Sequence, residues 1–174
     1  MKCSVFIATS LDGYIARADG SLDWLPPGGG EEHGYTEFMV TVDVVVMGRI
    51  TYETVLTFDT WPYVGKPVVV LSTRPLQPTT LPGTVVEAMS GTPDEIVARL
   101  AARGSQHAYV DGGITVQRFL DAGLIQRMII TRIPVVLGRG IPLFGPVSRD
   151  IRLEHVATRS YQSGMVQSEY TITA

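Results

Sequence analysis

The sequence has few of the residues on which several classes of site depend. It contains one cysteine and three histidines among 174 residues, so an internal disulfide is excluded and no ligand spacing typical of a zinc site is present. The single Cys3 falls in the apolar start of the first predicted strand, where a buried thiol is a simpler interpretation than a redox role. No Walker lysine motif or nucleophile elbow occurs either. We therefore expect no resident metal.

Charge is also sparse, at 18% of the residues, and the formal net charge is −3. A chain of this kind has no broad basic surface, so a nucleic acid partner is not expected. The longest apolar runs are far shorter than a membrane span, and the apolar run after Met1 reaches polar residues too early for a signal peptide. These features predict a cytoplasmic protein that recognises anions, if at all, through a few placed arginines and helix ends.

The composition is that of an ordinary globular protein, with 45% hydrophobic residues. No internal repeat, linker or low-complexity tract divides the chain, and its length fits one domain with a sizeable core. We therefore treat residues 1–174 as a single domain.

The runs at residues 44–47 and 68–71 are all apolar and lack polar alternation, and residues 107–110 are predicted as a third buried strand. Such runs are typical of central strands that helices cover on both faces. Further strands are expected at residues 3–9, 14–16 and 84–88, and helices at 31–42, 52–56, 92–102 and 116–123. Thr92, Pro93 and Glu95 form the capping signal of the third helix. In an open α/β sheet, ligands collect at the carboxyl ends of the parallel strands.

The most informative stretch follows the first of these runs, where Gly48, Arg49 and Thr51 occur within four residues. Gly48 allows a close backbone approach, Arg49 carries a planar fork suited to phosphate, and Thr51 lies where a helix would begin. Two interpretations are open at this point. The stretch is either an anion site or a plain strand-to-helix turn with a solvated arginine and a threonine cap.

The last third of the chain has a different pattern. Residues 127–136 form a β-rich run broken by Pro134, residues 137–145 are rich in glycine, and residues 152–161 and 165–173 predict an antiparallel hairpin. The segment 134–144 is either a surface loop or part of a twofold interface. Because the apolar run before it needs cover on both sides, we expect a homodimer.

Five motifs in this order resemble the dihydrofolate reductase-like superfamily, and within it the reductase domain of bacterial riboflavin biosynthesis proteins. They are residues 8–16 (ATSLDGYIA), 46–52 (VMGRITY), 70–74 (VLSTR), 111–113 (DGG) and 134–144 (PVVLGRGIPLF). The resemblance implies an α/β fold, a three-layer αβα sandwich with a mostly parallel central sheet and an antiparallel C-terminal hairpin.

The resemblance also implies NADPH as the cofactor, in an extended pose across the strand ends. Main-chain groups near Ala8 and Ile15 would hold the nicotinamide, and Gly112 and Gly113 would allow the backbone to approach the pyrophosphate. The other expected contacts are Gly48, Arg49 and Thr51 to the phosphates, Leu71, Ser72, Thr73 and Arg74 to the adenosine 2′-phosphate, and Ile114, Thr115 and Val116 beside the pyrophosphate.

The residues themselves favour the same cofactor. Arg49 and Arg74 follow successive buried strands, and two arginines suit a dinucleotide that carries an additional 2′-phosphate. NAD sites of the familiar kind instead place a carboxylate on the ribose hydroxyls. We therefore expect NADPH rather than NADH.

The substrate side is less sharply defined by the sequence. In dihydrofolate reductases a carboxylate on the first helix anchors the pterin, and Glu32 falls near that position, with Glu31 and Glu37 as alternatives. Asp12 is the other candidate catalytic residue, although it also suits a simple turn. Riboflavin-pathway reductases usually have lysine where this chain has Tyr14, so a phosphorylated ribose would lose a cationic contact here.

These expectations leave three possible functions. The first is an NADPH-dependent reductase of a small heterocyclic substrate, resembling 5-amino-6-(5-phosphoribosylamino)uracil reductase. The second is dihydrofolate reductase activity, and the third is a non-catalytic NADPH-binding module. In the first two, the cofactor carries the hydride chemistry and the protein orients the rings.

Overall fold

A computed structural model of the protein describes residues 1–26, 33–79 and 82–172. Its main feature is an eight-stranded sheet with the order β5-β4-β3-β6-β1-β7-β10-β9, and a small second sheet pairs β2 with β8. The strands are β1 (Lys2–Ser10), β2 (Tyr14–Ala16), β3 (Val44–Gly48), β4 (Pro67–Leu71), β5 (Val85–Met89), β6 (His107–Asp111), β7 (Arg127–Ile133), β8 (Ile141–Pro142), β9 (Glu154–Ser160) and β10 (Val166–Thr171). The helices are α1 (Tyr35–Val40), α2 (Arg49–Val55), α3 (Pro93–Ala102) and α4 (Gly113–Asp121).

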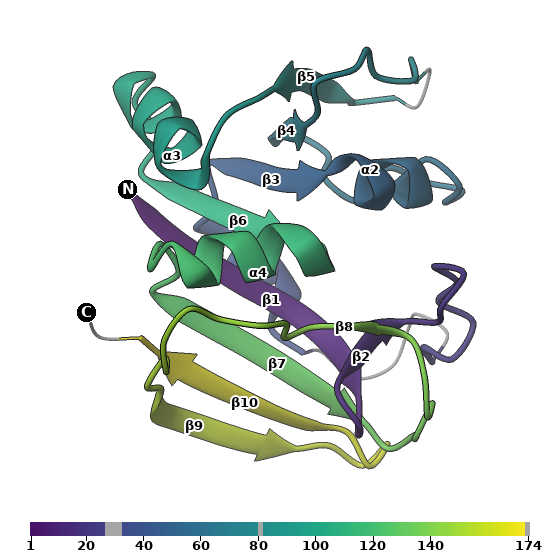
Figure 1. Ribbon diagram of the computed structural model, residues 1–174. Coiled ribbons are helices and arrows are strands. Elements are labelled where there is room, and N and C mark those ends of the chain that lie inside the picture. The colour runs from purple at the N-terminus through teal and green to yellow at the C-terminus, as the bar shows by residue number, and fades with distance from the viewer. Residues whose placement is uncertain (27–32, 80–81, 173–174) are drawn as a thin grey trace.

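Six of the eight strands are parallel, from β5 at one edge to β7. The last two strands, β10 and β9, form an antiparallel hairpin that adds to β7. The prediction of a mostly parallel sheet with an antiparallel C-terminal hairpin is therefore confirmed. All parallel strands end at one edge of the sheet, which places the ends of β3, β4 and β6 side by side (Figure 1).

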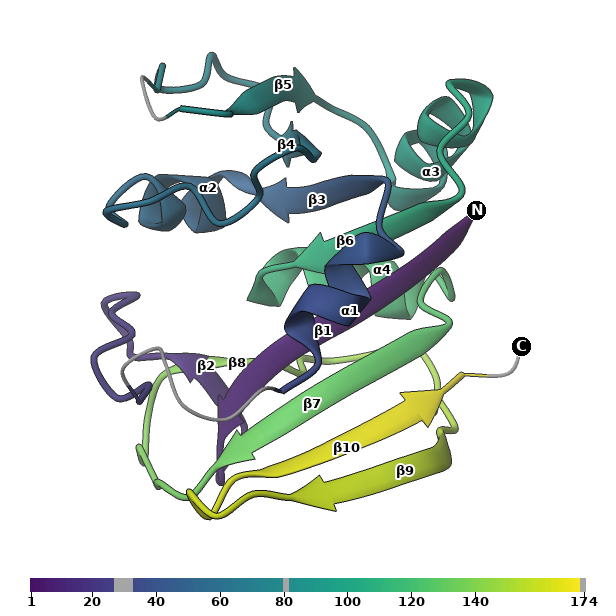
Figure 2. The same ribbon diagram turned by 180° about the vertical axis from the view of Figure 1, so that it is seen from behind.

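Helices cover both faces of the sheet, which gives the three layers that were expected. Helices α3 and α4 lie on one face (Figure 1), and α1 crosses the opposite face (Figure 2). Each face has its own apolar cluster. One contains Ile96 and Phe119 from α3 and α4, and the other contains Phe38 and Tyr52 from α1 and α2. The apolar runs of β3 and β4 are buried because their side chains alternate between the two clusters.

The structure confirms some of the predicted helix boundaries and differs from others. The Thr92 side chain accepts a hydrogen bond from the Glu95 amide, and Glu95 reaches back to the Thr92 amide, so the capping box of α3 is confirmed. The helix expected over residues 31–42 is observed only as α1, because Gly34 has a left-handed φ of 78° just before it. The helix expected at residues 52–56 begins three residues earlier, at Arg49.

Two other boundaries differ from the expected ones. The β-rich run predicted over residues 127–136 ends at Ile133, since Pro134 has no amide for a further ladder hydrogen bond. The following segment passes along the sheet to the short strand β8 and then to β9 (Figure 1). In the part of the chain that the structure describes, every helix is too short or too polar to span a bilayer.

Candidate functional site

The ends of β3 and β6 fit closely against each other at the carboxyl edge of the sheet. Met47 pairs with Asp111 in register, so the helices that follow, α2 and α4, begin beside one another. A Cβ on Gly48 would lie 2.9 Å from Thr115 Oγ1, and a Cβ on Gly112 would collide with Thr51 Oγ1. The side chains of Thr115 and Thr51 therefore leave no room for a side chain at positions 48 and 112. With glycine at both positions, no side chain covers the backbone there.

The start of α4 is the best-formed anion site at this edge. Gly112 precedes the helix with φ of 90°, a conformation that favours glycine. The first amides of a helix have no intrahelical acceptor, so those of Gly113, Ile114 and Thr115 are available to a ligand. Val116 differs from this expectation, because its side chain is buried in the core and its amide donates to the Gly112 carbonyl. The place of Val116 beside the pyrophosphate stays a prediction.

A pocket of about 350 Å³ lies beside this edge, where β4 and β5 end. Arg49 and Arg74 both line it, together with Leu71, Ser72 and Thr73. Arg49 is held by Glu53 at 2.7 Å and by the Pro75 carbonyl at 2.9 Å. The sequence did not reveal a third arginine, Arg118, because it lies on α4, far along the chain, and only the fold brings it here.

The charge of this pocket suits an anionic ligand. Three arginines line it, and no carboxylate is among the described residues that line it. Ser72 Oγ accepts from the Arg74 amide at 3.1 Å and donates to the Arg74 carbonyl at 2.8 Å, which makes a tight turn after β4. A cationic pocket next to free helix amides suits a ligand with phosphates at two places.

The residues expected at the nicotinamide end lie on β1 and β2. Ala8 lies on β1, and Ile15 lies on β2 after the turn at residues 11–13. A Cβ on Gly113 would lie 3.2 Å from the Ile15 side chain, so the β2 segment packs directly on the start of α4. This contact connects the predicted nicotinamide end to the predicted pyrophosphate end in one continuous edge.

Asp12 is fixed by the loop that follows β7. Its carboxylate accepts hydrogen bonds from the amides of Leu137, at 3.1 Å, and Gly138, at 2.7 Å. Hydrogen bonds with the Ser10 side chain and these amides lower the pKa of Asp12 to about 2. The group is exposed and ionised at neutral pH, so its geometry suits an acceptor that positions a loop rather than a proton donor.

Sequence reasoning overlooked a second carboxyl group, that of Asp111, at the end of β6. Asp111 Oδ1 accepts from the Gly112 amide at 2.8 Å, and Oδ2 accepts from the Tyr63 hydroxyl at 2.9 Å. Burial raises the pKa of Asp111 despite these hydrogen bonds. The sequence feature that could have indicated Asp111 is its position directly before two glycines. There its side chain holds the turn that precedes α4.

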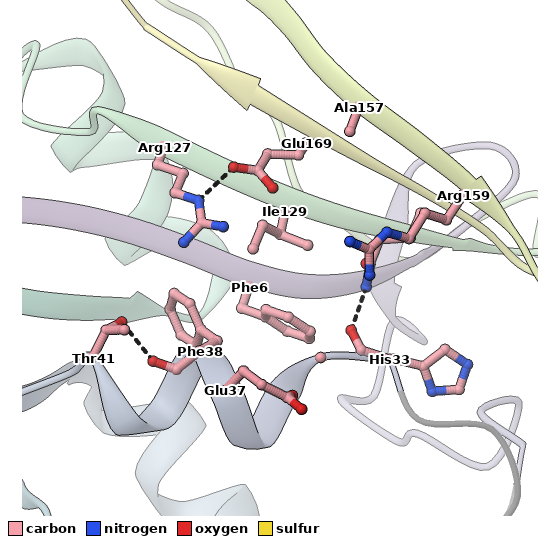
Figure 3. A pocket seen from close by; sticks show the side chains of 12 residues that line it. Phe6, His33, Glu37, Phe38, Thr41, Arg127, Ile129, Ala157, Arg159 and Glu169 are labelled. Atoms are coloured by element: carbon pink, nitrogen blue, oxygen red, sulfur yellow. Dashed lines mark hydrogen bonds and ion pairs between the residues drawn. The ribbon is translucent and has the colours of Figure 1, made fainter.

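A larger pocket, of about 520 Å³, lies between α1 and the bare face of the sheet beyond β1 (Figure 3). Phe6 and Ile129 form its floor, Glu37 lines it from α1 with Thr41 just after that helix, and Arg159 lines it from β9. Glu32, the predicted substrate carboxylate, and Glu31 lie outside the described residues. Glu37, the remaining alternative, is the acid that α1 brings to this pocket. Among the residues described, no histidine, cysteine and carboxylate cluster is arranged to hold a metal ion.

Comparisons with known proteins agree with this geometry. The chain is 37% identical over 163 residues to the uncharacterized protein YwjB of Bacillus subtilis, with 92% of each chain covered. It is 41% identical to a putative riboflavin biosynthesis protein of Shewanella sp. PV-4, with all of both chains covered and a TM-score of 0.91. The Thermotoga maritima diaminohydroxyphosphoribosylaminopyrimidine deaminase/5-amino-6-(5-phosphoribosylamino)uracil reductase shares the fold, with a TM-score of 0.78 at 15% identity. The chain covers 56% of that longer protein.

Dihydrofolate reductase of Enterococcus faecalis has the same fold, with a TM-score of 0.67 at 19% identity over 99% of this chain and 97% of that one. The fold is thus the dihydrofolate reductase-like α/β fold. The family model of the RibD C-terminal domain matches residues 2–167. This chain belongs to the RibD C-terminal domain family.

Proposed function

We propose that the protein is an NADPH-dependent reductase of a small heterocyclic substrate, resembling 5-amino-6-(5-phosphoribosylamino)uracil reductase. The observation that carries this proposal is the pocket where Arg49, Arg74 and Arg118 converge beside the start of α4. A 2′-phosphate in this pocket would meet guanidinium groups, while the pyrophosphate would meet the helix amides. The match to the RibD C-terminal domain family supports a reductase reaction at this site.

NADPH, when bound, supplies the hydride, and the protein's own residues bind and orient. Gly112 and Gly113 let the backbone approach the pyrophosphate. Asp111 holds this turn because its carboxylate accepts a hydrogen bond from the Gly112 amide. Ala8 and Ile15 border the nicotinamide end. Asp12 holds the loop at Leu137 against the turn before β2, which helps to close that end.

The site for the substrate is then the pocket between α1 and the sheet. Phe6 lies two residues before Ala8 on β1, so both point to the same face of the sheet. Of the two predicted catalytic residues, Asp12 is tied to a loop, and Glu32 remains a proposal. Glu37 is the acid on α1 that we propose to contact the substrate.

A titration of the unaltered protein with NADPH and with NADH tests the cofactor. We expect tighter binding of NADPH, and a smaller preference in Arg74→Gln, because the exposed Arg74 guanidinium no longer meets the 2′-phosphate. Arg152→Gln, an exposed arginine outside the pocket, serves as the control. Equal affinities for the two cofactors in the unaltered protein would refute the proposal.

Turnover assays separate the three candidate functions. Oxidation of NADPH with the aminopyrimidine ribosyl phosphate supports the first, and oxidation with dihydrofolate supports the second. Tight NADPH binding without oxidation of either substrate favours a non-catalytic module. The dihydrofolate alternative has its own support in the fold shared with dihydrofolate reductase.

We further propose a cytoplasmic homodimer. Val136 and Phe144, at either end of the glycine-rich segment after β7, are 65% and 49% exposed, and Leu11 beside that segment is 60% exposed. Exposed apolar side chains that lie near one another suit an interface. Sedimentation equilibrium should give twice the chain mass, and Phe144→Asp should shift it to the mass of one chain. A monomer in the unaltered protein would exclude the dimer.

A further inference from the structure

The small sheet formed by β2 and β8 lies at the carboxyl edge of the main sheet and carries the proposed nicotinamide end of the site (Figure 1). Its strands pair at Ala16 and Ile141. The Leu143 amide adds a hydrogen bond to the Gly13 carbonyl at 3.0 Å. A sheet of two short strands is only marginally stable by itself. The position of this sheet is therefore set by the elements that it contacts.

An apolar contact places the small sheet on the start of α4. A Cβ on Gly113 would lie 3.2 Å from side-chain atoms of both Ile15 and Ile141, so both strands touch the first turn of the helix. Helix α4 is a firm support, because Val116 and Phe119 are buried in the core. Apolar contact is not directional, however, and by itself it lets two surfaces slide against each other.

A glutamine on α4 adds a directional contact. Gln117 lies one turn after Gly113, on the same face of the helix. Its side-chain nitrogen donates to the Pro142 carbonyl at 3.0 Å and to the Leu143 carbonyl at 3.3 Å. A primary amide has two N–H groups, so one side chain serves both carbonyls. Gln117 therefore holds the end of β8, and through it β2, at one position on α4.

Gly145 leaves the space that this glutamine needs. A Cβ on residue 145 would lie 2.5 Å from Gln117 Oε1 and 2.8 Å from Gln117 Cδ. Gly145 is not among the glycines with positive φ, so its backbone conformation does not require glycine. Room for the Gln117 amide is the physical requirement for glycine at this position. The two residues form a matched pair between α4 and the segment after β8.

The other end of the same segment is tied to the turn before β2. We call residues 134–145 the strap. The Leu11 amide donates to the Val135 carbonyl at 2.8 Å, and Asp12 accepts hydrogen bonds from two amides of the strap. The strap is therefore joined to the turn at residues 11–13 near its beginning, and to α4 by Gln117 near its end.

We propose that Gln117 is a positioning residue that sets the spacing between the nicotinamide end of the site and the start of α4. One ribose joins the nicotinamide of a dinucleotide to its pyrophosphate. Both groups are therefore bound well only when the two ends of the site are correctly spaced. The inference rests on the proposed function, because it assigns the two ends of the site to the two halves of NADPH. Gln117 acts on the cofactor through β8 and β2.

Loss of this contact should affect one half of the cofactor. The fragment 2′-phospho-ADP-ribose carries the pyrophosphate and the 2′-phosphate of NADPH but lacks the nicotinamide. Its affinity should not depend on Gln117, since it needs only the start of α4 and the arginine-lined pocket. NADPH should bind more weakly without the Gln117 amide. A glutamine that only stabilised the fold would instead weaken both ligands equally.

The test compares Gln117→Leu with the unaltered protein in calorimetric titrations with NADPH and with 2′-phospho-ADP-ribose. Leucine is close to glutamine in size and adds no charge. We expect the NADPH affinity to fall about three- to tenfold, as for the loss of a hydrogen bond, and the fragment affinity to stay the same. Gln106→Leu is the matched control, because Gln106 is exposed just before β6, at the opposite edge of the sheet.

A second variant moves the Gln117 amide without replacing it. In Gly145→Ala the new methyl group must displace that amide, so this variant should show the same selective loss of NADPH affinity. The double variant should lose less than the sum of the two single losses, because both substitutions act on one contact.

Hydrogen exchange reports the contact without any cofactor. The Leu143 amide, which donates to the Gly13 carbonyl, should exchange about three- to tenfold faster in Gln117→Leu, the factor for one hydrogen bond lost from the small sheet's support. In Gln106→Leu its exchange should be unchanged.

Three results would overturn the inference. The first is an equal loss of affinity for NADPH and for the fragment, and the second is no loss for either. The third is unchanged exchange of the Leu143 amide in Gln117→Leu, which refutes the contact whatever the ligands do. If the unaltered protein binds neither ligand, the proposed cofactor is refuted, and the positioning role with it. Faster Leu143 exchange would then still show that Gln117 holds β8, so the two failures are distinguishable.

Discussion

Thr51 and Gly112 pack against each other at the carboxyl edge of the sheet, and Thr51 Oγ1 fills the space that a Cβ on residue 112 would need. The two residues come from different strand ends, 61 positions apart in the sequence by their numbers. Their fit holds the starts of α2 and α4 together.

The first prediction is that Gly112→Ala destabilises the fold and weakens NADPH binding together. The φ of 90° strains any side chain, and the new methyl group must displace Thr51, so we expect a loss of about 1–3 kcal/mol in the free energy of unfolding. Urea denaturation and an NADPH titration measure the two effects.

Gly104→Ala is the matched control for this prediction. Gly104 has a φ of 93°, but a Cβ there would meet nothing within 4 Å. It therefore reports the backbone strain alone. Thr51→Ala in the Gly112→Ala background should recover part of the difference, since the collision is with Oγ1. No recovery would show that the contact is not the cause.

The second prediction concerns Arg118, which the sequence did not connect with the cofactor. Arg118→Gln should lower the affinity for NADPH about two- to fivefold, the range for an exposed charged contact, and leave the affinity for NADH unchanged. Calorimetric titrations with both cofactors measure this, with Arg152→Gln as the control. An equal loss for NADH would assign Arg118 to the pyrophosphate or to structure instead.

The third prediction concerns Asp111. Because burial raises its pKa in the folded protein, the unfolded chain loses this proton first as the pH rises. The contribution of Asp111 to stability therefore falls as the pH rises from the unfolded pKa, about 3.9, through the raised folded value, and is constant above it. Asp111→Asn keeps an acceptor for one donor and removes this dependence.

The measurement for Asp111 is the free energy of unfolding from pH 4 to pH 8 for both proteins. We expect the variant to gain on the unaltered protein as the pH increases. If instead the unaltered protein gains on the variant over this range, the carboxyl group is better stabilised as an anion than its burial indicates.

Local and ordered features of the fold were predictable from the sequence. The apolar run at residues 44–47 suited a strand covered on both faces, and Thr92 with Glu95, three residues later, specified a helix start through two reciprocal hydrogen bonds. The convergence of Arg49 and Arg74 followed from parallel strands ending at one edge. These inferences need only chain-local chemistry and the rule for parallel sheets.

The pocket under α1 could not be predicted in the same way. Its walls come from α1 and from β9, more than a hundred residues apart, and the place of Arg159 relative to Ala8 depends on the register of four strands. The pairing of β10 with β9 also shifts by one residue between Glu169 and Tyr170 of β10. Arg159 in the sequence is one exposed cation among many, and only the fold gives it a position.

The last prediction is that Asp12 acts by positioning the loop after β7. Its pKa is lowered to about 2, so its stabilising effect is present above the unfolded pKa of about 3.9 and is lost as the pH falls through about 2. Asp12→Asn offers one acceptor oxygen where the carboxylate offers two, so at neutral pH the amides of Leu137 and Gly138 should exchange with solvent faster. Hydrogen exchange followed by NMR measures this, with Asp94→Asn, an exposed acid on α3, as the control. The contradicting result is that both amides stay protected in Asp12→Asn while turnover is lost. Asp12 would then act in the chemical step and not by positioning the loop.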